Sequence, residues 1–376
     1  MKRTGSLFDN IFSKENLYSA YLDARRGKRK RRACFQFEIE LGTNLANLYE
    51  EIHSARYKPM PYFKFIVYEP KERIIHAPAF RDIVVQHAIY RVVYPIFDKT
   101  FINTSFACRL GYGTHRASNY TQGALRACRD KDYILKLDIR KFFYSIDREI
   151  LRKQIERKIK DRGLVEIMML FAPLENVQPA PLDSKHLTGP VSSVRNRNSC
   201  GIRENSLTGF AQKDEPLGIP IGNLLSQIYA LIYLNPLDHY IKRVLKVKHY
   251  VRYVDDFILI GLTRDKCLEY KSLIVDFLKD KLCLELSKST IQKVKHGVNF
   301  VGYRTWKNKR LIRKYSLYKF KRAVKQGKEL SVVSLLGHAK QTNSLKYMLK
   351  IIKDSSNAKD IVLSKSYRGL YSAKPR

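Results

Sequence analysis

The chain has 376 residues, and its 71 lysines and arginines against 35 aspartates and glutamates give a formal net charge of +36. Hydrophobic residues make up 44% of the chain, which excludes a disordered protein and favours a globular one with two or three subdomains. A compact protein with this charge needs a polyanionic partner, nucleic acid first and a membrane surface second, although a merely solvated basic surface is the alternative.

Residues 1–55 are predicted to form a basic N-terminal extension. No apolar stretch follows the first charged residues, so we expect no secretory signal, and no run in the chain reaches transmembrane length. Within the extension, the run at 25–32 is expected to bind RNA or DNA, although a solvated and poorly ordered charge run is the alternative. The predicted RNA-binding residues are Arg25, Arg26, Lys28, Arg29, Lys30, Arg31 and Arg32.

The middle of the chain predicts a helix, a strand and an insertion. Residues 82–98 have the pattern of a buried amphipathic helix, which we expect to break at Pro95. Residues 133–139 alternate as a strand and are followed by a helix. Residues 174–217 are rich in proline, serine, asparagine and glycine and keep no hydrophobic period, so they predict a long, flexible surface insertion.

The last third predicts two helices, at 220–235 and 265–285, and a strongly basic helical region from about residue 305. There, Leu345, Met348, Leu349 and Ile352 form an apolar stripe that indicates ordinary core packing. The six cysteines include no Cys-x-x-Cys pair, which argues against a zinc site and a disulfide framework. We therefore expect reduced thiols and a cytoplasmic location.

Residues 249–261, His-Tyr-Val-Arg-Tyr-Val-Asp-Asp-Phe-Ile-Leu-Ile-Gly, are the most informative segment. Two apolar, β-branched and aromatic runs flank two adjacent acids, which predicts a β-hairpin with Asp255 and Asp256 at its turn. Acids held there by buried strands are costly unless they are solvated or bind a metal. Because Mg²⁺ prefers carboxylate oxygens on a rigid mount, the hairpin indicates a metal site.

A third carboxylate, Asp138, stands at the end of the strand predicted at 133–139. Folding would bring it to the hairpin, where the acids could hold two Mg²⁺ ions, with Mn²⁺ as the other option. Phosphoryl transfer needs little beyond such positioning and charge neutralisation. Alone, an Asp-Asp pair is usually only a turn and a strand-end Asp only a helix cap. The predicted metal site comprises Asp138, Ile139, Asp255 and Asp256.

With both acid motifs in place, residues 56–340 resemble reverse transcriptases. Asp138 matches the first palm motif of that family, and the Tyr253-Val-Asp-Asp256 segment matches the second. The resemblance implies an α+β, right-hand polymerase fold with fingers, an antiparallel palm sheet and a helical thumb. It implies fingers at 56–132, palm at 133–173 and 218–305 around the insertion, and a basic helical thumb at 306–376.

The resemblance also implies roles for single residues. Asp138, Asp255, Asp256 and Lys288 would be catalytic, with Lys288 as a general acid for pyrophosphate, although a surface lysine is the ordinary outcome. Phe143 would be a steric gate against ribose, unless it only packs in the core. Expected substrate contacts are Lys71, Arg73, Phe143, Ile221, Gly222, Gln227 and Tyr253, and expected primer contacts are Phe300, Gly302 and Tyr303.

One segment resembles the diversity-generating retroelement branch of the family. Most reverse transcriptases carry Gln where this chain has Ile221, and Pro where it has Gln227. This branch copies a template-repeat RNA with errors at adenines, together with a small basic accessory protein. Because isoleucine cannot hydrogen-bond in the nucleotide pocket, a mismatched nucleotide should lose less binding free energy relative to a correctly paired one. Three further segments agree with the branch, namely Arg81-Asp-Ile-Val-Val-Gln-His87, the one from Ser105 to His115, and Ser334-Leu-Leu-Gly337-His338-Ala339.

Other functions stay open. Leu225, where the branch often has Thr, and the length of the 174–217 insertion fit a defence-associated reverse transcriptase that makes cDNA from its own non-coding RNA. A catalytically silent RNA-binding maturase or chaperone is opposed by the intact acids, and RNA synthesis by Phe143. We expect no intron-type endonuclease and no RNase H module. Expected partners are template RNA, the RNA–DNA hybrid and deoxynucleoside triphosphates, without a membrane.

Overall fold

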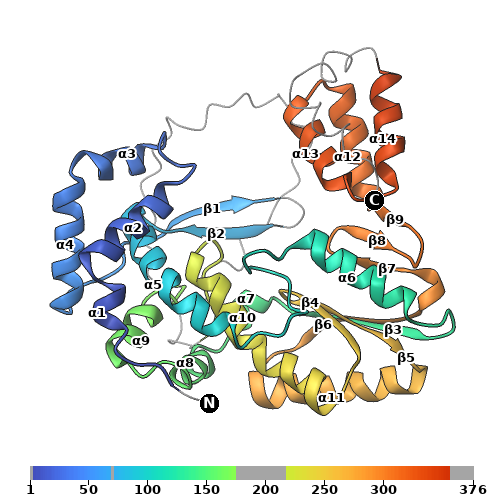
Figure 1. Ribbon diagram of the computed structural model, residues 1–376, viewed down its shortest axis with the longest axis horizontal. Helices are drawn as coiled ribbons and strands as arrows, with labels where there is room; N and C mark the ends of the chain where they lie inside the picture. Colours follow the sequence, from blue (N-terminus) through green and yellow to red (C-terminus); the bar gives the residue numbers. More distant parts are fainter. Residues whose placement is uncertain (1–2, 69–71, 175–216, 356–376) are drawn as a thin grey trace, which may run out of the picture. The chain divides into compact units, whose positions relative to one another are not determined.

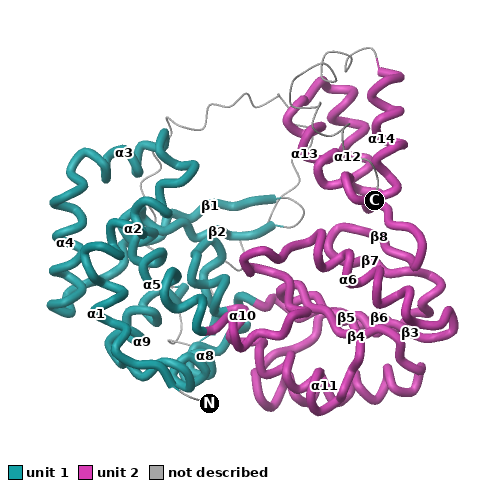
Figure 2. Tube along the Cα trace, viewed as in Figure 1, with its two compact units in different colours: residues 1–96, 143–229 teal, residues 97–142, 230–376 magenta. Residues whose placement is uncertain are grey.

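The computed structural model describes residues 3–68, 72–174 and 217–355, which belong to two compact units (Figure 2). Unit 1 is Met1–Ile96 with Phe143–Tyr229, and unit 2 is Phe97–Phe142 with Ala230–Arg376. Each unit therefore combines two separate stretches of chain. Nearly all of the predicted 174–217 insertion lies outside the described residues, as does Lys71.

Unit 1 is mainly helical, with one antiparallel hairpin (Figure 1). Local sequence fixes several helix starts: the Ser13 side chain accepts a hydrogen bond from the Asn16 amide, and Asp147 caps the helix that follows it. The elements are α1 (Phe8–Ile11), α2 (Lys14–Arg25), α3 (Arg32–Ile39), α4 (Leu41–His53), β1 (Phe63–Val67), β2 (Arg73–Ala77), α5 (Phe80–Asp98), α8 (Arg148–Glu156) and α9 (Arg162–Met169).

The basic run at 25–32 joins α2 to α3 and is not a separate arm. Glu38 of α3 pairs with Arg25 at 2.9 Å and with Arg29 at 3.6 Å, and Asp23 pairs with Arg26 at 3.0 Å. Acids of the flanking helices therefore pair with three of the cations, Arg25, Arg26 and Arg29. Most of the run remains exposed, so its RNA-binding role stays a prediction.

Helix α5 runs from Phe80 to Asp98, so the predicted break at Pro95 is wrong. Proline removes one amide hydrogen bond to the preceding turn, but here the helix ends within one more turn, which limits the loss. Val93 and Tyr94, just before the proline, are 0% and 5% exposed, and their burial favours the helix through this point.

Unit 2 contains a four-stranded antiparallel sheet in the order β4-β5-β3-β6. Its strands are β3 (Tyr133–Ile139), β4 (His249–Tyr253), β5 (Asp256–Leu262) and β6 (Leu286–Lys293). The predicted strand at 133–139 and the predicted hairpin with its acids at the turn are both confirmed. The central strand β3 lies between β5 and β6, which both come much later in the chain.

Helices cover both faces of this sheet (Figure 1). Helix α6 (Thr114–Arg126) packs on the face that carries Ile134, Val251 and Ile258, which share a buried core with Leu125. Helix α11 (Arg264–Leu282) contacts β3 and β6. The helix predicted at 220–235 is α10 (Leu224–His239), and α10 continues into a π-helical turn, η1 (Tyr240–Val244).

A second, three-stranded sheet leads to the C-terminal helices of unit 2. It contains β7 (Val298–Phe300), β8 (Tyr303–Thr305) and β9 (Arg310–Ile312), paired antiparallel in that order. The helices that follow are α12 (Lys314–Lys325), α13 (Glu329–Ala339) and α14 (Ser344–Lys353). The predicted apolar stripe lies on α14, where Met348 and Ile352 are fully buried in the core of the three helices and Leu345 and Leu349 pack beside them. Its interpretation as core packing is confirmed.

The helices and the cysteines bear on the sequence predictions about a membrane and about disulfides. No helix within the described residues has the length and apolarity needed to cross a membrane. Cys34, Cys108, Cys128, Cys267 and Cys283 are all free thiols. The structure therefore offers no disulfide among these five cysteines.

Candidate active site

The acid motif forms the tight turn between β4 and β5. Val254, at its centre, has φ of +56°, a left-handed conformation that is unfavourable for a β-branched residue by about 1–2 kcal/mol. Two hydrogen bonds hold this turn: Arg252 Nη1 donates to the Val254 carbonyl at 3.0 Å, and the Ile139 amide donates to the Asp255 carbonyl at 3.3 Å. The turn is thus fixed to its own strand and to the end of β3.

The sheet register places four predicted site residues in one row. Tyr253 of β4 pairs with Asp256 of β5, Asp256 pairs with Asp138 of β3, and Asp138 pairs with Lys288 of β6. Cross-strand partners lie on the same face of a sheet with their Cβ atoms roughly 5 Å apart. The acids predicted from two distant motifs are therefore direct neighbours, with a lysine on the far side of Asp138.

A buried ion pair supports the acid turn from the opposite face of the sheet. Arg252 and Asp238 are both 0% exposed; Arg252 Nε and Nη2 donate to the two Asp238 oxygens at 2.8 and 2.6 Å. The Tyr250 hydroxyl donates to Asp238 Oδ1 at 2.7 Å. Although burial lowers it, the charge and hydrogen bonds of Asp238 raise the pKa of Arg252 above its usual range. Arg252 thus stays charged and holds the Val254 carbonyl.

Asp256 is in a poor environment for a negative charge. Burial raises the pKa of Asp256 above its usual value and the nearby Asp138 raises it further, whereas the Lys136 ammonium lowers it. Lys136 Nζ donates to Asp256 Oδ2 at 2.7 Å, and the other oxygen, Oδ1, is buried without a hydrogen-bond partner. An unpartnered buried carboxylate oxygen is a destabilising feature that a bound cation would remove.

The donor set fits a hard divalent ion. Asp138 and Asp256 supply facing carboxylates from paired strands, and Asp255 belongs to the turn that leads directly into Asp256. Ser287 Oγ donates to Asp138 Oδ2 at 2.6 Å and orients this carboxylate. Within residues 3–68, 72–174 and 217–355, no three acid, histidine or cysteine side chains gather into a metal-holding group as they stand. Of the predicted ligands, the structure brings Asp138 and Asp256 together.

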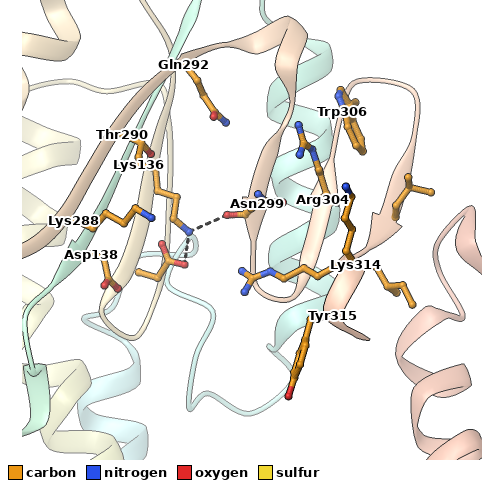
Figure 3. A pocket seen from close by; sticks show the side chains of 14 residues that line it. Lys136, Asp138, Lys288, Thr290, Gln292, Asn299, Arg304, Trp306, Lys314 and Tyr315 are labelled. Atoms are coloured by element: carbon orange, nitrogen blue, oxygen red, sulfur yellow. Dashed lines mark hydrogen bonds and ion pairs between the residues drawn. The ribbon is translucent and has the colours of Figure 1, made fainter. Parts of the chain in front are cut away.

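A pocket of about 860 Å³ opens from these acids towards the second sheet (Figure 3). Lys136 and Lys288 line it on the side of the acids, and Arg304, Trp306 and Lys314 line it on the other side. Arg304 also lies over the Trp306 ring, 4.9 Å from its centroid. The pocket thus combines two carboxylates with several cations, which suits a polyanion whose reacting end lies near the acids.

The predicted primer turn joins β7 to β8 at this pocket. The Phe300 and Tyr303 rings are 1% and 0% exposed, so direct contact with a primer is left to the backbone of the turn. The Tyr303 hydroxyl lies 3.2 Å from His115 Nδ1 and 3.1 Å from His338 Nδ1. Gly302 has φ of +90°, and a Cβ there would lie 3.1 Å from the His338 ring. Two of the motifs noted in the sequence thus meet at Tyr303.

The remaining predicted substrate residues belong to unit 1. Arg73 begins β2 and is exposed. The Ile221 carbonyl accepts a hydrogen bond from the His76 amide at 2.7 Å. Gly222 has φ of +119°, and a Cβ there would lie 2.8 Å from the His76 carbonyl oxygen, so this position requires glycine. Phe143 is half-buried in α7 (Phe142–Ser145), and Gln227 is exposed on α10.

Several residues that position the site carry no role in the sequence-based prediction. Lys136 lies within the strand predicted at 133–139, and Arg252 lies within the predicted hairpin. A charged residue at an inward position of a buried strand needs a partner, so Arg252 did carry a signal. Its partner Asp238 had none, because long-range pairing is not visible in local sequence. The Arg81–His87 motif proves partly structural: Gln86 accepts from the Leu224 amide at 2.9 Å and starts α10.

Facing carboxylates at a strand end, beside a pocket lined with cations, are typical of enzymes that transfer phosphoryl groups on nucleic acid. The family model described as reverse transcriptase (RNA-dependent DNA polymerase) matches residues 69–305, and the chain belongs to this family. The prediction of an RNA-directed DNA polymerase is confirmed. The predicted α+β class is confirmed as well, because the described residues form helices and separate antiparallel sheets. The family generally depends on divalent metal ions.

Named relatives are distant in sequence. Protein YkfC of Escherichia coli is 24% identical over 351 residues, covering 81% of this chain and 78% of the relative. The COX1/OXI3 intron 2 protein of Saccharomyces cerevisiae is 25% identical over 256 residues, covering 59% of this chain and 29% of the relative. The chain thus spans under a third of the yeast protein.

Solved structures with some likeness include two telomerases. Telomerase from Candida albicans, solved with a fragment of telomeric RNA, has a TM-score of 0.41 at 14% identity and covers 85% of this chain and 62% of its own. Telomerase from Candida tropicalis has a TM-score of 0.46 at 12% identity, covering 84% and 58%. This chain therefore spans about three fifths of either telomerase.

Proposed function

We propose that this reverse transcriptase copies a template-repeat RNA into cDNA with errors at template adenines, and so diversifies a retroelement's target gene. The observation that carries the proposal is Ile221, a side chain without hydrogen-bonding groups where most of the family has Gln. The hydrogen bond from His76 and the close approach of Gly222 support a fixed backbone at this point. Because the backbone is fixed, the identity of the side chain at position 221 decides whether this position can hydrogen-bond in the nucleotide pocket.

The catalytic part of the proposal assigns DNA synthesis to the row formed by Tyr253, Asp256, Asp138 and Lys288. Two divalent ions, Mg²⁺ or alternatively Mn²⁺, would be held by Asp138, Asp255 and Asp256 with the Ile139 carbonyl. Such ions supply activation of a 3′-hydroxyl and neutralisation of the leaving group. The unpartnered Asp256 Oδ1 supports this assignment. Lys288, opposite Asp138, is proposed to donate a proton to pyrophosphate.

Substrate selection is proposed to rest on residues of unit 1 and on the turn at 300–303. Lys71 and Arg73 would bind the triphosphate, Phe143 would exclude a ribose 2′-hydroxyl, and Gly222 and Gln227 would line the nucleotide site. The exposed basic run at 25–32 is proposed to bind the structured RNA. These roles come from the family resemblance, and the exposure of Arg73 and of the run supports them.

A second candidate function is defence, in which the enzyme makes cDNA from its own non-coding RNA. Leu225 favours it, since the diversity-generating branch often has Thr there, and the length of the 174–217 segment favours it as well. Leu225 is fully buried in α10, where Thr would place a hydroxyl that needs a partner. The two functions share the same chemistry and differ in template and fidelity.

Primer extension in Mg²⁺ on an adenine-containing RNA, followed by sequencing of the products, tests the proposal. We expect errors concentrated opposite adenine in the wild type and fewer in Ile221→Gln. The control is Asp255→Ala with Asp256→Ala, which should make no product. Accurate copying by the wild type, or copying only of a native non-coding RNA, would favour defence. No synthesis by the wild type on either template would favour a silent RNA-binding protein.

A further inference from the structure

Lys136 forms an ion pair with Asp256, one of the acids of the proposed active site, and it has no role in the proposed function. It stands on β3 two residues before Asp138, so both side chains are on the same face of the sheet. Its ammonium donates to Asp256 Oδ2 at 2.7 Å and to the Asn299 carbonyl at 2.9 Å, as Figure 3 shows. The Phe300 ring centroid lies 5.7 Å from the same nitrogen.

The surroundings of Lys136 explain why a cation is needed at this point. Asp256 and Asp138 are direct cross-strand partners, and like charges facing each other destabilise a sheet. The Asp256 side chain is 24% exposed, so water screens this repulsion only in part. Lys136, itself 21% exposed, supplies the compensating charge at one carboxylate oxygen.

We propose that Lys136 is a built-in counter-ion that stands in for a divalent ion at Asp256 and competes with it for the Oδ2 oxygen. This inference rests on the metal site of the proposed function. Lysine suits the role because its point charge is on a flexible stem with three donors. When Asp256 turns to a metal, the ammonium keeps its hydrogen bond to Asn299, next to the turn at 300–303. Lys136 would therefore set how much free divalent ion the enzyme needs.

An ordinary structural ion pair predicts a different outcome. Removing Lys136 from such a pair would weaken the fold by the same amount with or without metal. Removing a competing counter-ion would weaken the metal-free protein only and would strengthen metal binding. The two cases can thus be separated without measuring DNA synthesis.

The test uses the full chain as wild type, Lys136→Met and Lys136→Gln. Mn²⁺ binding is measured by electron paramagnetic resonance, and thermal unfolding is followed with and without MgCl₂. Hydrogen bonds to charged groups contribute enough that we expect roughly tenfold tighter Mn²⁺ binding in Lys136→Met. We also expect its unfolding temperature to be low without Mg²⁺ and close to the wild-type value with it. Lys136→Gln keeps a hydrogen-bond donor, so it provides a folded variant without the charge.

Two controls isolate the effect. Lys131→Met removes an exposed charge away from the acids and should behave as wild type. Asp256→Asn removes the proposed ligand and should bind Mn²⁺ weakly. Equal Mn²⁺ affinity in wild type, Lys136→Met and Lys136→Gln would overturn the counter-ion role, as would a loss of stability that Mg²⁺ does not reverse. If wild type and Asp256→Asn bound Mn²⁺ alike, the metal site of the proposed function would fail instead.

Discussion

Two turns of unit 2 contain the residues proposed for catalysis and for primer contact, and they are held in opposite ways. Each places a valine at positive φ, Val254 at +56° and Val301 at +44°, a conformation that needs outside support. The acid turn is held by the fully buried charges of Arg252 and Asp238. The turn at 300–303 is held by a neutral hydroxyl, that of Tyr303, between two imidazoles.

This difference bears on how rigidly each of the two turns is held. A buried ion pair is not a good source of net stability, but losing one partner is very costly, so it keeps one geometry. The Tyr303 cluster instead joins three separate elements, because His115 belongs to α6 and His338 to α13. We infer that the acid turn is fixed, while the position of the second turn depends on how the C-terminal helices are packed.

The largest effect is expected from breaking the charged support. Asp238→Asn leaves Arg252 buried without a counter-charge, which should lower the free energy of unfolding by about 3–5 kcal/mol. DNA synthesis should fall with it, because Arg252 no longer holds the Val254 carbonyl in place. Denaturant unfolding and primer extension measure the two effects. Asp276→Asn, an exposed acid on α11, is the matched control and should change neither.

A double variant sharpens this prediction. Arg252→Met with Asp238→Leu replaces the pair with apolar side chains, so we expect the stability lost in Asp238→Asn to return. Its DNA synthesis should stay low, since the hydrogen bond to Val254 is absent. Recovery of both properties would show that the ion pair does not position the turn.

A smaller effect is expected from the neutral support. Tyr303→Phe keeps the ring but leaves His338 without its hydroxyl partner, which should cost about 1–2 kcal/mol of stability. We expect the KM for primer to rise several-fold while kcat at saturating primer changes less, because the catalytic acids are untouched. Tyr318→Phe, an exposed tyrosine on α12, serves as the control. A fall in kcat with an unchanged KM would contradict a role for Tyr303 at the primer turn.

The smallest effect is expected from pH. Burial lowers the pKa of His338 below its ordinary value of 6.5, with further lowering by His115 and Arg313 and an opposing hydrogen bond to Gly302. The unfolded chain therefore binds the proton first, so the contribution of His338 to stability is complete above pH 6.5 and is lost as the pH falls through the folded-state pKa.

His338→Gln tests this contribution. Denaturant unfolding of wild type and variant between pH 7.5 and roughly pH 5 should show a smaller loss of stability in the variant. Other half-buried histidines, such as His87, whose pKa partial burial lowers to about 4, contribute equally in both proteins, so the comparison removes their effect. If the free energy of unfolding fell with pH at the same rate in both proteins, His338 would have the same pKa in the folded and unfolded states, which would contradict the prediction.

Local sequence patterns were enough to predict the strands β3, β4 and β5 and the acids at their ends. The alternation in 133–139 predicted β3, because a half-buried strand has a two-residue period. The two apolar, β-branched and aromatic runs around Asp255 and Asp256 predicted the β4–β5 hairpin. What local patterns could not supply is register. Nothing near Asp138 indicates that Asp256 and Lys288 become its neighbours, since that pairing is decided by the packing of whole strands.

The misses have the same cause. Pro95 predicted a break from its own chemistry, but packing before it keeps α5 helical. The run at 25–32 was interpreted from charge alone, and the acids Asp23 and Glu38 that hold it belong to the flanking helices. Asp238 and Lys136 became visible only with their partners in space. Sequence therefore predicts which residues are unusual, and structure tells what each one is paired with.

The order of the strands has a consequence for the making of the protein. Strand β3 is synthesised first, yet both of its neighbours, β5 and β6, follow more than a hundred residues later. A growing or truncated chain that ends before Asp256 would expose both edges of a strongly apolar strand, which invites aggregation. The row formed by Tyr253, Asp256, Asp138 and Lys288 can close only after Lys288 has left the ribosome. Chaperone demand and the solubility of shortened chains should both change at that point.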